Sequence, residues 1–329
     1  MLTDIPVTEL QIGDDVQGFY IFRDPAHRTS AAGKPYLTAR LTDRSGSVDM
    51  ILWSYSGPLG PDDAGAVVKV RGHVNDFRGA PQLAVSRIRL ATEEDEYDLT
   101  ALVPSAPIDP DEAMAEIRAL ADSLGDPDYR ALAGALLTRH EASFRRIPAA
   151  KSVHHGFVGG LLMHTLHMLR LAEVLAGMYP LCDRDLLLTG TLLHDLAKER
   201  EFLLSPVGLV TEYSVPGQLL GHLVMGAQEA AAVAAELGVP EEKSVLVQHM
   251  ILSHHGEPDF GAAVRPQIAE AELLSLIDLI DSRMEIYREA LAETDLGRFS
   301  QRVFALDRRV YKHRDPEEAA GPEEGGQTP

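Results

Sequence analysis

Short runs of alternating apolar and polar residues dominate the first 90 residues of the chain. Such alternation predicts strands, because successive side chains of a strand point to opposite faces of a sheet. The expected strands cover Val16–Phe22, Pro35–Thr42, Ser47–Trp53, Val67–Val74 and Pro81–Leu90. Turn-forming residues at 43–46 and 78–81 separate neighbouring runs, as hairpins require. Five short strands in so few residues predict a small closed or partly open β-barrel.

The rest of the chain has helical periodicity behind an acidic, proline-containing segment, Glu93 to Asp111, which is typical of a linker. Asp109, Asp126 and Asp183 each precede residues that favour a helix start, so we expect them to cap helices. The chain is therefore expected to be multidomain. It would hold an all-β barrel of the OB-fold type at 1–91, an acidic linker with connecting helices at 92–150, an all-α domain at 151–313 and a disordered acidic tail at 314–329.

Composition favours a folded protein of the cytoplasm. Apolar residues make up 45% of the chain, and a single cysteine, Cys182, excludes an intramolecular disulfide and a thiolate zinc finger. The first residues lack the basic and apolar regions of a signal peptide. His164, His167, Arg170 and Glu173 interrupt the longest apolar run, so no membrane span is expected.

The net charge of −20 does not exclude nucleic acid as a partner, because the distribution of charge matters more than its sum. Basic and acidic residues balance in the first 90 positions. The excess of acid lies in Glu93–Glu96, in the helical part and in the tail.

Histidines gather in the helical part: nine of the 13 lie between His154 and His255, mostly inside apolar runs. Imidazole or carboxylate groups on the core-facing side of a helix are costly unless something compensates them. A divalent cation held by several helices would do so. A lone buried histidine is more often a hydrogen-bonded core residue, and we expect this for His140, His167 and His249. The adjacent pair His194–Asp195 is harder to explain in that way.

His164, the doublet His194–Asp195 and Asp278 resemble the H…HD…D signature of the HD-domain metal-dependent phosphohydrolases, and Lys198 extends it to H-D-x-x-K. The longer strings at 151–164, 221–222 and 253–256, behind an OB-like barrel, resemble the YhaM-type 3′→5′ exoribonucleases. This resemblance covers nearly the whole chain except the acidic tail.

The resemblance implies an all-α HD domain that binds one or two divalent ions. Mn²⁺ is favoured, and Fe²⁺, Ni²⁺, Mg²⁺ and Zn²⁺ are alternatives. The expected metal ligands are His164, His194, Asp195, His222, His254 and Asp278. Asp195 would bridge two ions, and with Lys198, whose ammonium would reach the phosphate, it forms the expected catalytic pair. His155, His255 and Asp281 would support the ligands from behind, with His255 as an alternative third ligand. Ser275 stands where the family often has a histidine, so we expect altered tuning of the metal.

Substrate contacts are expected in two places. Arg145, Arg146 and Lys151, just before His154, would hold phosphates, although isolated charges of this kind are as often plain surface residues. On the barrel, Lys34, Tyr36, Phe77 and Arg78 would bind a single strand through cations and stacked aromatics. Trp53 is expected to lie in the core more often than on a binding surface.

The preferred function is a metal-dependent 3′→5′ exonuclease for single-stranded RNA, with single-stranded DNA as a second substrate; the direction comes from the resemblance alone. One alternative is an HD phosphohydrolase for free or cyclic nucleotides. The other is a non-catalytic single-strand-binding protein of replication control. A homo-oligomer is also expected from the resemblance, with Ala227–Leu237 either at a contact or in the core.

Overall fold

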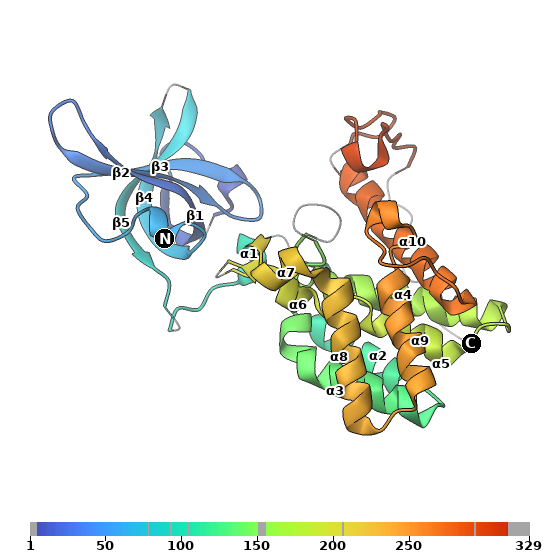
Figure 1. The fold of residues 1–329 in the computed structure, drawn as a ribbon. Coiled ribbons are helices and arrows are strands. Elements are labelled where there is room, and N and C mark those ends of the chain that lie inside the picture. The colour runs from blue at the N-terminus through green and yellow to red at the C-terminus, as the bar shows by residue number, and fades with distance from the viewer. Residues whose placement is uncertain are drawn as a thin grey trace, which may run out of the picture.

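The computed structural model describes residues 5–77, 79–92, 94–103, 105–150, 156–205, 207–292 and 294–314. It has a β-barrel at the N-terminal side and a helical part after it, as Figure 1 shows. Among these residues, no helix combines the length and the apolar character that a membrane span needs.

The barrel has five strands, β1 (Asp15–Thr29), β2 (Pro35–Thr42), β3 (Ser47–Trp53), β4 (Val67–Phe77) and β5 (Ala80–Leu90). They close in the order β1-β2-β3-β5-β4, with β3 and β5 parallel and every other pair antiparallel. This is a five-stranded barrel of the OB-fold class, as the sequence predicts. Alternation places Val16, Tyr20 and Phe22 inside the barrel.

Strand β1 extends seven residues past Phe22, the end that its apolar pattern predicts, because it continues through a register shift between Arg23 and Ala26. Asp24 has a positive φ of 49° at this point, which bends the strand. Short 3-10 turns lie at Val7–Glu9 and Pro61–Asp63.

The helical part contains α1 (Leu99–Leu102), α2 (Pro110–Asp122), α3 (Pro127–Phe144), α4 (Gly160–Met178), α5 (Arg184–Leu193), α6 (Lys198–Glu201), α7 (Val215–Leu219), α8 (Gly221–Leu237), α9 (Glu241–Ser253) and α10 (Ala269–Ala292). A hairpin of β6 (Phe202–Leu204) and β7 (Val210–Tyr213) follows α6. Further 3-10 turns lie at Pro258–Phe260 and Phe304–Leu306. The three expected capping aspartates are confirmed, since Asp109, Asp126 and Asp183 each accept two backbone N–H groups.

One hydrophobic core unites the helical part from α2 to α10. Met114 and Ile117 of α2 and Leu132 of α3 belong to it, so these helices pack with the later ones. Ala227, Ala230 and Ala234 of α8 are buried in the same core, whereas Leu237 at the end of the helix is 45% exposed.

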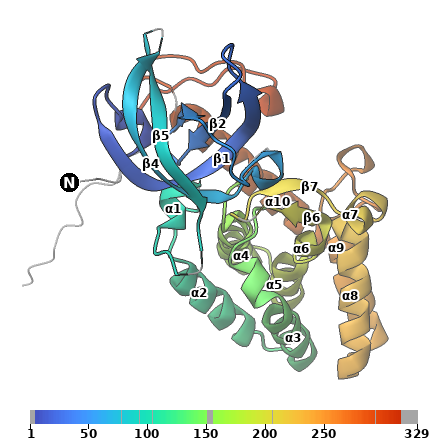
Figure 2. The same ribbon diagram turned by 90° about the vertical axis from the view of Figure 1, so that its left-hand side faces the viewer.

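A third apolar cluster joins the barrel to the helices. Ile21 and Val67, on the outer face of β1 and β4, pack with Leu102 and Val103 of the connecting segment and with Val207 between β6 and β7. Figure 2 shows α1 directly below the barrel. All five side chains are at most 7% exposed. The barrel therefore rests on the helical part through a buried junction.

Candidate metal centre

Six side chains predicted from the sequence meet at one point, where the ends of several helices come together. These are His164 on α4, His194 and Asp195 at the end of α5, His222 at the start of α8, His254 at the end of α9 and Asp278 on α10. Close packing of α5 on α9 brings two of these ends together. A Cβ at Gly190 would lie 2.5 Å from Cε of Met250, so this approach requires glycine.

Asp195 lies at the centre and turns a different oxygen to each side. Its Oδ2 is 3.2 Å from Nε2 of His194 and 3.9 Å from Nε2 of His164. Its Oδ1 is 3.2 Å from Nε2 of His222 and 3.7 Å from Nε2 of His254. Asp278 reaches the first side, with Oδ1 3.3 Å from Nε2 of His164.

The backbone orients two of the imidazoles. Nδ1 of His194 lies 2.7 Å from the carbonyl oxygen of Thr191, and Nδ1 of His254 lies 2.7 Å from that of Ile251. A carbonyl accepts only, so each Nδ1 carries the proton and donates it. Each Nε2 is then left as an acceptor facing Asp195.

Carboxylates orient the other two. Nδ1 of His164 lies 2.7 Å from Asp281, in the supporting position expected for that aspartate. Nδ1 of His222 lies 3.0 Å from both carboxylate oxygens of Glu201. Carboxylate support behind a histidine is common where the histidine binds a metal, because it fixes the ring and raises its basicity.

Burial and charge act against one another in this cluster. Burial would raise the pKa of Asp195, but Lys198 and His194 outweigh it and hold that pKa well below its usual value. Burial would lower the pKa of His164, yet its hydrogen bonds to Asp278 and Asp281 raise it to about 9. The pKa of His254 is lowered, first by burial and then by the neighbouring His255. Asp195 is therefore ionised at neutral pH.

The donor set fits a divalent cation. Nε2 of His194, Oδ1 of Asp195 and Nε2 of His222 are buried atoms with no hydrogen-bond partner, which is costly in a closed interior. Two groups could each hold an ion, with their ligand atoms within 4.8 Å of one another: His164, His194 and Asp195, and His222, His254 and His255. Imidazole and carboxylate donors of this kind suit Mn²⁺, Fe²⁺, Ni²⁺ or Zn²⁺.

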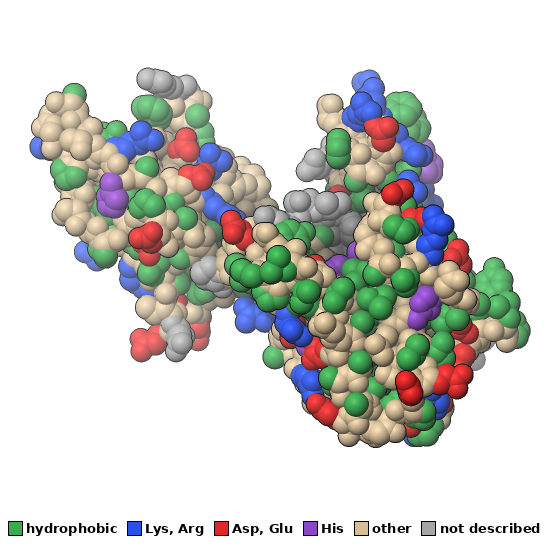
Figure 3. Space-filling view, in the orientation of Figure 1, with side chains coloured by type: hydrophobic (Ala, Val, Ile, Leu, Met, Phe, Trp, Pro, Cys, Tyr) green, Lys and Arg blue, Asp and Glu red, His purple; other side chains and the backbone are tan. Residues whose placement is uncertain are grey.

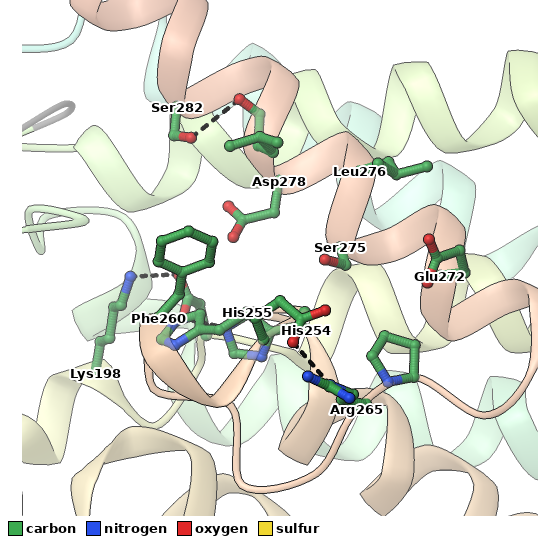
Figure 4. Close-up of a pocket in the computed structure, with 15 residues that line it drawn as sticks. Lys198, His254, His255, Phe260, Arg265, Glu272, Ser275, Leu276, Asp278 and Ser282 are labelled. Carbon is green, nitrogen blue, oxygen red and sulfur yellow. Dashed lines mark hydrogen bonds and ion pairs between the residues drawn. The ribbon is translucent and has the colours of Figure 1, made fainter. Parts of the chain in front are cut away.

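Lys198 lies in the position predicted for it. Its Nζ is 2.5 Å from Oδ2 of Asp195. Burial would lower the pKa of Lys198, but Asp195 outweighs this effect and the pKa is raised. Both residues line a cavity of about 460 Å³ together with His254, His255 and Asp278, which we call the catalytic pocket (Figure 4).

Ser275, the departure from the family pattern, also lines the catalytic pocket. A Cβ at Gly256, where φ is +76°, would lie 2.6 Å from its Oγ. The small serine therefore packs against the backbone that follows His254 and His255.

Several predicted residues lie elsewhere. Lys151, His155 and Arg78 lie outside the described residues. Arg145 does not line the catalytic pocket; it forms ion pairs with Asp111 and Glu141. Arg146 is exposed.

The aromatic residues predicted on the barrel are accessible. Phe77 is 51% exposed at the end of β4, and Lys34 is exposed in the turn before β2. Trp53, expected more often in the core, is 56% exposed, so that interpretation is wrong. Its ring lies 4.8 Å from that of Tyr36. Trp53 is the last residue of β3, where the inward face of the strand ends.

Four basic residues form a groove beside Trp53: Arg71 is a candidate from the sequence, whereas Lys69, Arg87 and Arg89 were not expected there. Lys69 and Arg71 of β4 lie directly opposite Arg89 and Arg87 of β5 on the outer face of the barrel. With Trp53 and Tyr55 they line a groove of about 700 Å³, which we call the barrel groove. Like charges directly opposite on two strands are destabilising, so this arrangement needs an anionic partner.

Asp95 of the acidic linker supplies part of that charge. Arg89 holds its carboxylate in a two-pronged contact at 2.5 and 2.6 Å, and Lys69 is 3.2 Å away. Arg71 and Arg87 have no carboxylate partner among the described residues. The sequence holds a signal for the groove. Arg87 and Arg89 are two residues apart in a predicted strand, so their side chains share one face, and Ile88 between them points to the other.

Comparison with known proteins agrees with this geometry. Residues 161–283 match the family model of the HD domain. The curated 3′-5′ exoribonuclease YhaM of Halalkalibacterium halodurans is 35% identical over 306 residues, which covers 92% of this chain and 93% of the relative.

Two solved OB-fold structures are each similar to 29% of the chain. The OB domain of Ta0387 from Thermoplasma acidophilum covers 29% of this chain and 90% of its own, with 13% identity and a TM-score of 0.23. The second OB-fold domain of replication protein A from Methanococcus maripaludis covers 29% and 98%, with 16% identity and a TM-score of 0.21. With scores this low, the class of the barrel rests on its own strand order.

The fold and the histidine–aspartate centre thus define an HD-domain protein with an OB-fold barrel. Within that class, the chain belongs to the YhaM family of 3′-5′ exoribonucleases.

Proposed function

We propose that the chain is a metal-dependent 3′→5′ exonuclease that hydrolyses the phosphodiester bonds of single-stranded RNA, and of single-stranded DNA as a second substrate. The observation that carries this proposal is Asp195, whose two oxygens each face a pair of imidazoles with their Nδ1 atoms held from behind. The substrate and the direction follow the name of the Halalkalibacterium relative.

We assign His164, His194, Asp195 and Asp278 to one divalent ion and His222 and His254 to a second, with Asp195 shared and His255 beside the second. When bound, such ions lower the pKa of water and neutralise charge on the phosphate. Mn²⁺ is the favoured ion for this donor set.

Side chains of the protein neutralise the charge of the phosphate and hold the histidines in position. Hydrolysis forms a bond between a water oxygen and phosphorus and breaks the bond from phosphorus to the 3′ oxygen of the neighbouring nucleotide. Lys198 stays protonated beside Asp195 and faces the catalytic pocket, so it stabilises negative charge on the phosphate oxygens. Asp281 and Glu201 keep His164 and His222 in the orientation and tautomer that leave Nε2 as a donor to metal.

The barrel holds the strand behind its 3′ end. Single-strand-binding grooves combine cations that follow the phosphates with aromatic rings that stack on bases. The barrel groove offers Arg71, Arg87 and Trp53 for these purposes, and the Tyr36 ring packs at a tilt against Trp53. Lys34 and Phe77 at the hairpin ends extend the proposed surface, and Arg78 stays a prediction from the sequence.

The test compares labelled single-stranded RNA with mononucleotide and cyclic nucleotide substrates in Mn²⁺. RNA labelled at its 5′ end should give a ladder that shortens with time, while RNA labelled at its 3′ end releases labelled mononucleotide at once. Hydrolysis of mononucleotides alone would favour the free-nucleotide phosphohydrolase. Tight binding of RNA that stays intact with every metal tried would favour the non-catalytic alternative.

Two further expectations belong with this proposal. A cytoplasmic location suits a chain with one cysteine and an RNA substrate. Self-association follows from the family resemblance, and analytical ultracentrifugation measures it.

A further inference from the structure

The lining of the catalytic pocket combines polar and apolar side chains. Asp195, Lys198 and Asp278 are polar. Phe260 adds an aromatic ring, and Leu276 and Leu279 of α10 add aliphatic side chains. Phe260 is 75% exposed, although it lines the pocket, and the two leucines are 45% and 48% exposed. Figure 4 shows the Phe260 ring on the same side as Lys198, across from α10.

The loop that carries Phe260 is tied in place. The Phe260 N–H donates to the carbonyl of Glu257, and Gly261 follows with a φ of +100°, which favours glycine. The Ala263 N–H donates to Leu252 in α9, which anchors the end of the loop. Phe260 is therefore presented to the pocket by defined structure.

Charged groups also line the pocket. Glu257 and Glu272 belong to the lining, and Arg265, 2.7 Å from Glu257, offsets one of the two. Lys198, 2.5 Å from Asp195, brings a cation to the same pocket. A phosphate is attracted to the Lys198 side, and the exposed Phe260 ring offers a face to an uncharged aromatic group.

We propose that Phe260 stacks on the base of the 3′-terminal nucleotide while the phosphate of that nucleotide lies beside Asp195 and Lys198. This rests on the proposed function and adds a contact that determines specificity for an intact terminal base. A nucleotide joins a charged phosphate to an aromatic base, and the pocket offers both a cation and an exposed aromatic ring. A cavity of about 460 Å³ lies within the range of small-molecule sites. Stacking accepts any base, because every base has a π-face.

The test uses two short RNAs that differ only at the 3′ end, one with an ordinary nucleotide and one with an abasic nucleotide. We expect the wild-type protein to have a KM about tenfold higher for the abasic end. Phe260→Ala should raise KM for the ordinary end by a similar factor and remove the difference between the two RNAs. Phe260→Trp should restore the difference, which a merely structural role of Phe260 would not explain. Phe304→Ala is the matched control, since Phe304 is 96% exposed outside the pocket.

A binding measurement separates this proposal from the proposed function. Titration calorimetry in Mn²⁺ should show that AMP binds about tenfold more tightly than ribose 5-phosphate, and that Phe260→Ala abolishes the preference. If RNA is not degraded but this preference is found, the exonuclease proposal fails and the base site stands. Equal binding of the two probes by the wild type, or an unchanged preference in folded Phe260→Ala, overturns the base site.

Discussion

Asp195 contacts both halves of the metal centre, so its loss affects both at once. We predict that Asp195→Ala abolishes hydrolysis and removes bound metal, because neither imidazole pair keeps its shared carboxylate. Elemental analysis of the purified protein and an RNA-degradation time course measure the two effects. Asp62→Ala, an exposed aspartate on the barrel, is the control. A folded Asp195→Ala protein with full metal content and activity would refute the site.

Lys198 is expected to act on the phosphate and not to hold metal. Lys198→Met should therefore keep the metal content and lower kcat by a factor of about 10² to 10³, the usual loss for one charge-stabilising donor. Lys243→Met is a matched control, because Lys243 likewise forms ion pairs with aspartates, here Asp126 and Asp128, but lies outside the catalytic pocket. Loss of metal together with activity would instead make Lys198 a support for Asp195.

His140 has the core role expected for it, and this role has a pH signature. Its two nitrogens contact Glu199 at 2.7 Å and Glu229 at 3.0 Å. Burial would lower the pKa of His140, but the two glutamates outweigh it and raise the pKa above its ordinary 6.5. The stabilisation is thus complete below about pH 6.5, the unfolded value, and is lost as pH rises through the higher folded pKa.

The corresponding prediction compares the wild type with His140→Gln. At pH 6 the variant should be less stable by about 2 kcal/mol, the scale of a hydrogen bond to a charged group. This difference should shrink as the pH is raised above the folded pKa. Urea unfolding across pH 6 to 9, with metal removed, measures it. A difference that stays constant or grows with pH contradicts the assignment.

The sequence pattern located the proposed ligands and the Asp281 support behind His164, but not the Glu201 support behind His222. His164, His194, Asp195 and Asp278 follow a fixed spacing that brings them together in one fold. Glu201 lies at the end of a four-residue helix and meets His222 only through the tertiary fold. Phe260 has no helical or strand pattern around it, so nothing in the chain distinguishes it from an ordinary loop residue.

At the scale of elements, the β4–β5 ribbon provides the cations of the barrel groove. We predict that Arg71→Ala combined with Arg87→Ala weakens binding of a long single strand about tenfold near 0.1 M salt. The slope of the logarithm of the binding constant against the logarithm of the salt concentration should decrease in magnitude by about 1.4, or 0.7 for each lost phosphate contact. Hydrolysis of dinucleotides should not change. Trp53 is the chain's one tryptophan, so quenching of its fluorescence measures binding at the groove directly.

Arg28→Ala is the control for this pair, because Arg28 is exposed on the distal half of β1, away from the groove lining. If the double variant binds with unchanged affinity and slope, while Lys34→Ala weakens binding, the hairpin-end residues form the site instead.

Strand positions were predictable because alternation is a local signal: β2, β3 and β4 begin at the expected residue, and β1 and β5 begin one residue earlier. The extension of β1 past Arg23 was not predictable from alternation, because it depends on pairing with β2 across a bulge. The exposure of Trp53 depends on where β3 leaves the barrel, which alternation does not encode.

For the whole molecule, the buried junction around Ile21 couples the two parts. We predict that Ile21→Asp loosens the barrel from the helices, because a carboxylate cannot be buried there without a partner. Small-angle scattering should show a larger radius of gyration, and long strands should be degraded less processively. Dinucleotide hydrolysis should persist, since the metal centre lies in the helical core.

Ile12→Asp is the matched control, because Ile12 is 57% exposed. Trp53 fluorescence checks that the barrel itself stays folded, since Tyr20 and Phe22, not Ile21, fill its core. Unchanged dimensions and processivity in Ile21→Asp would show that the junction does not organise the two parts.

The order of barrel, linker and helices was predictable, because each part has its own periodicity. The buried junction between barrel and helices was not predictable from the sequence. Leu102 and Val103 sit in a segment that reads as a flexible acidic linker, and their apolar partners Ile21 and Val207 are distant in the chain. The basic face of the barrel was likewise not predictable from the net charge of −20, because that sum does not show where the charges lie.

The buried junction also fixes the distance between the barrel groove and the catalytic pocket. Figure 3 shows the barrel and the helical part as one continuous body with a hollow between the barrel and the end of α10. Since Leu102 and Val103 are packed and not free, the span from barrel groove to catalytic pocket is set by the fold. A strand long enough to bind both sites has a higher affinity, because binding at one site raises the local concentration of the strand at the other. A shorter strand occupies one site alone. Degradation then slows once a strand is trimmed below that span, and the leftover fragments share a length that the protein dictates.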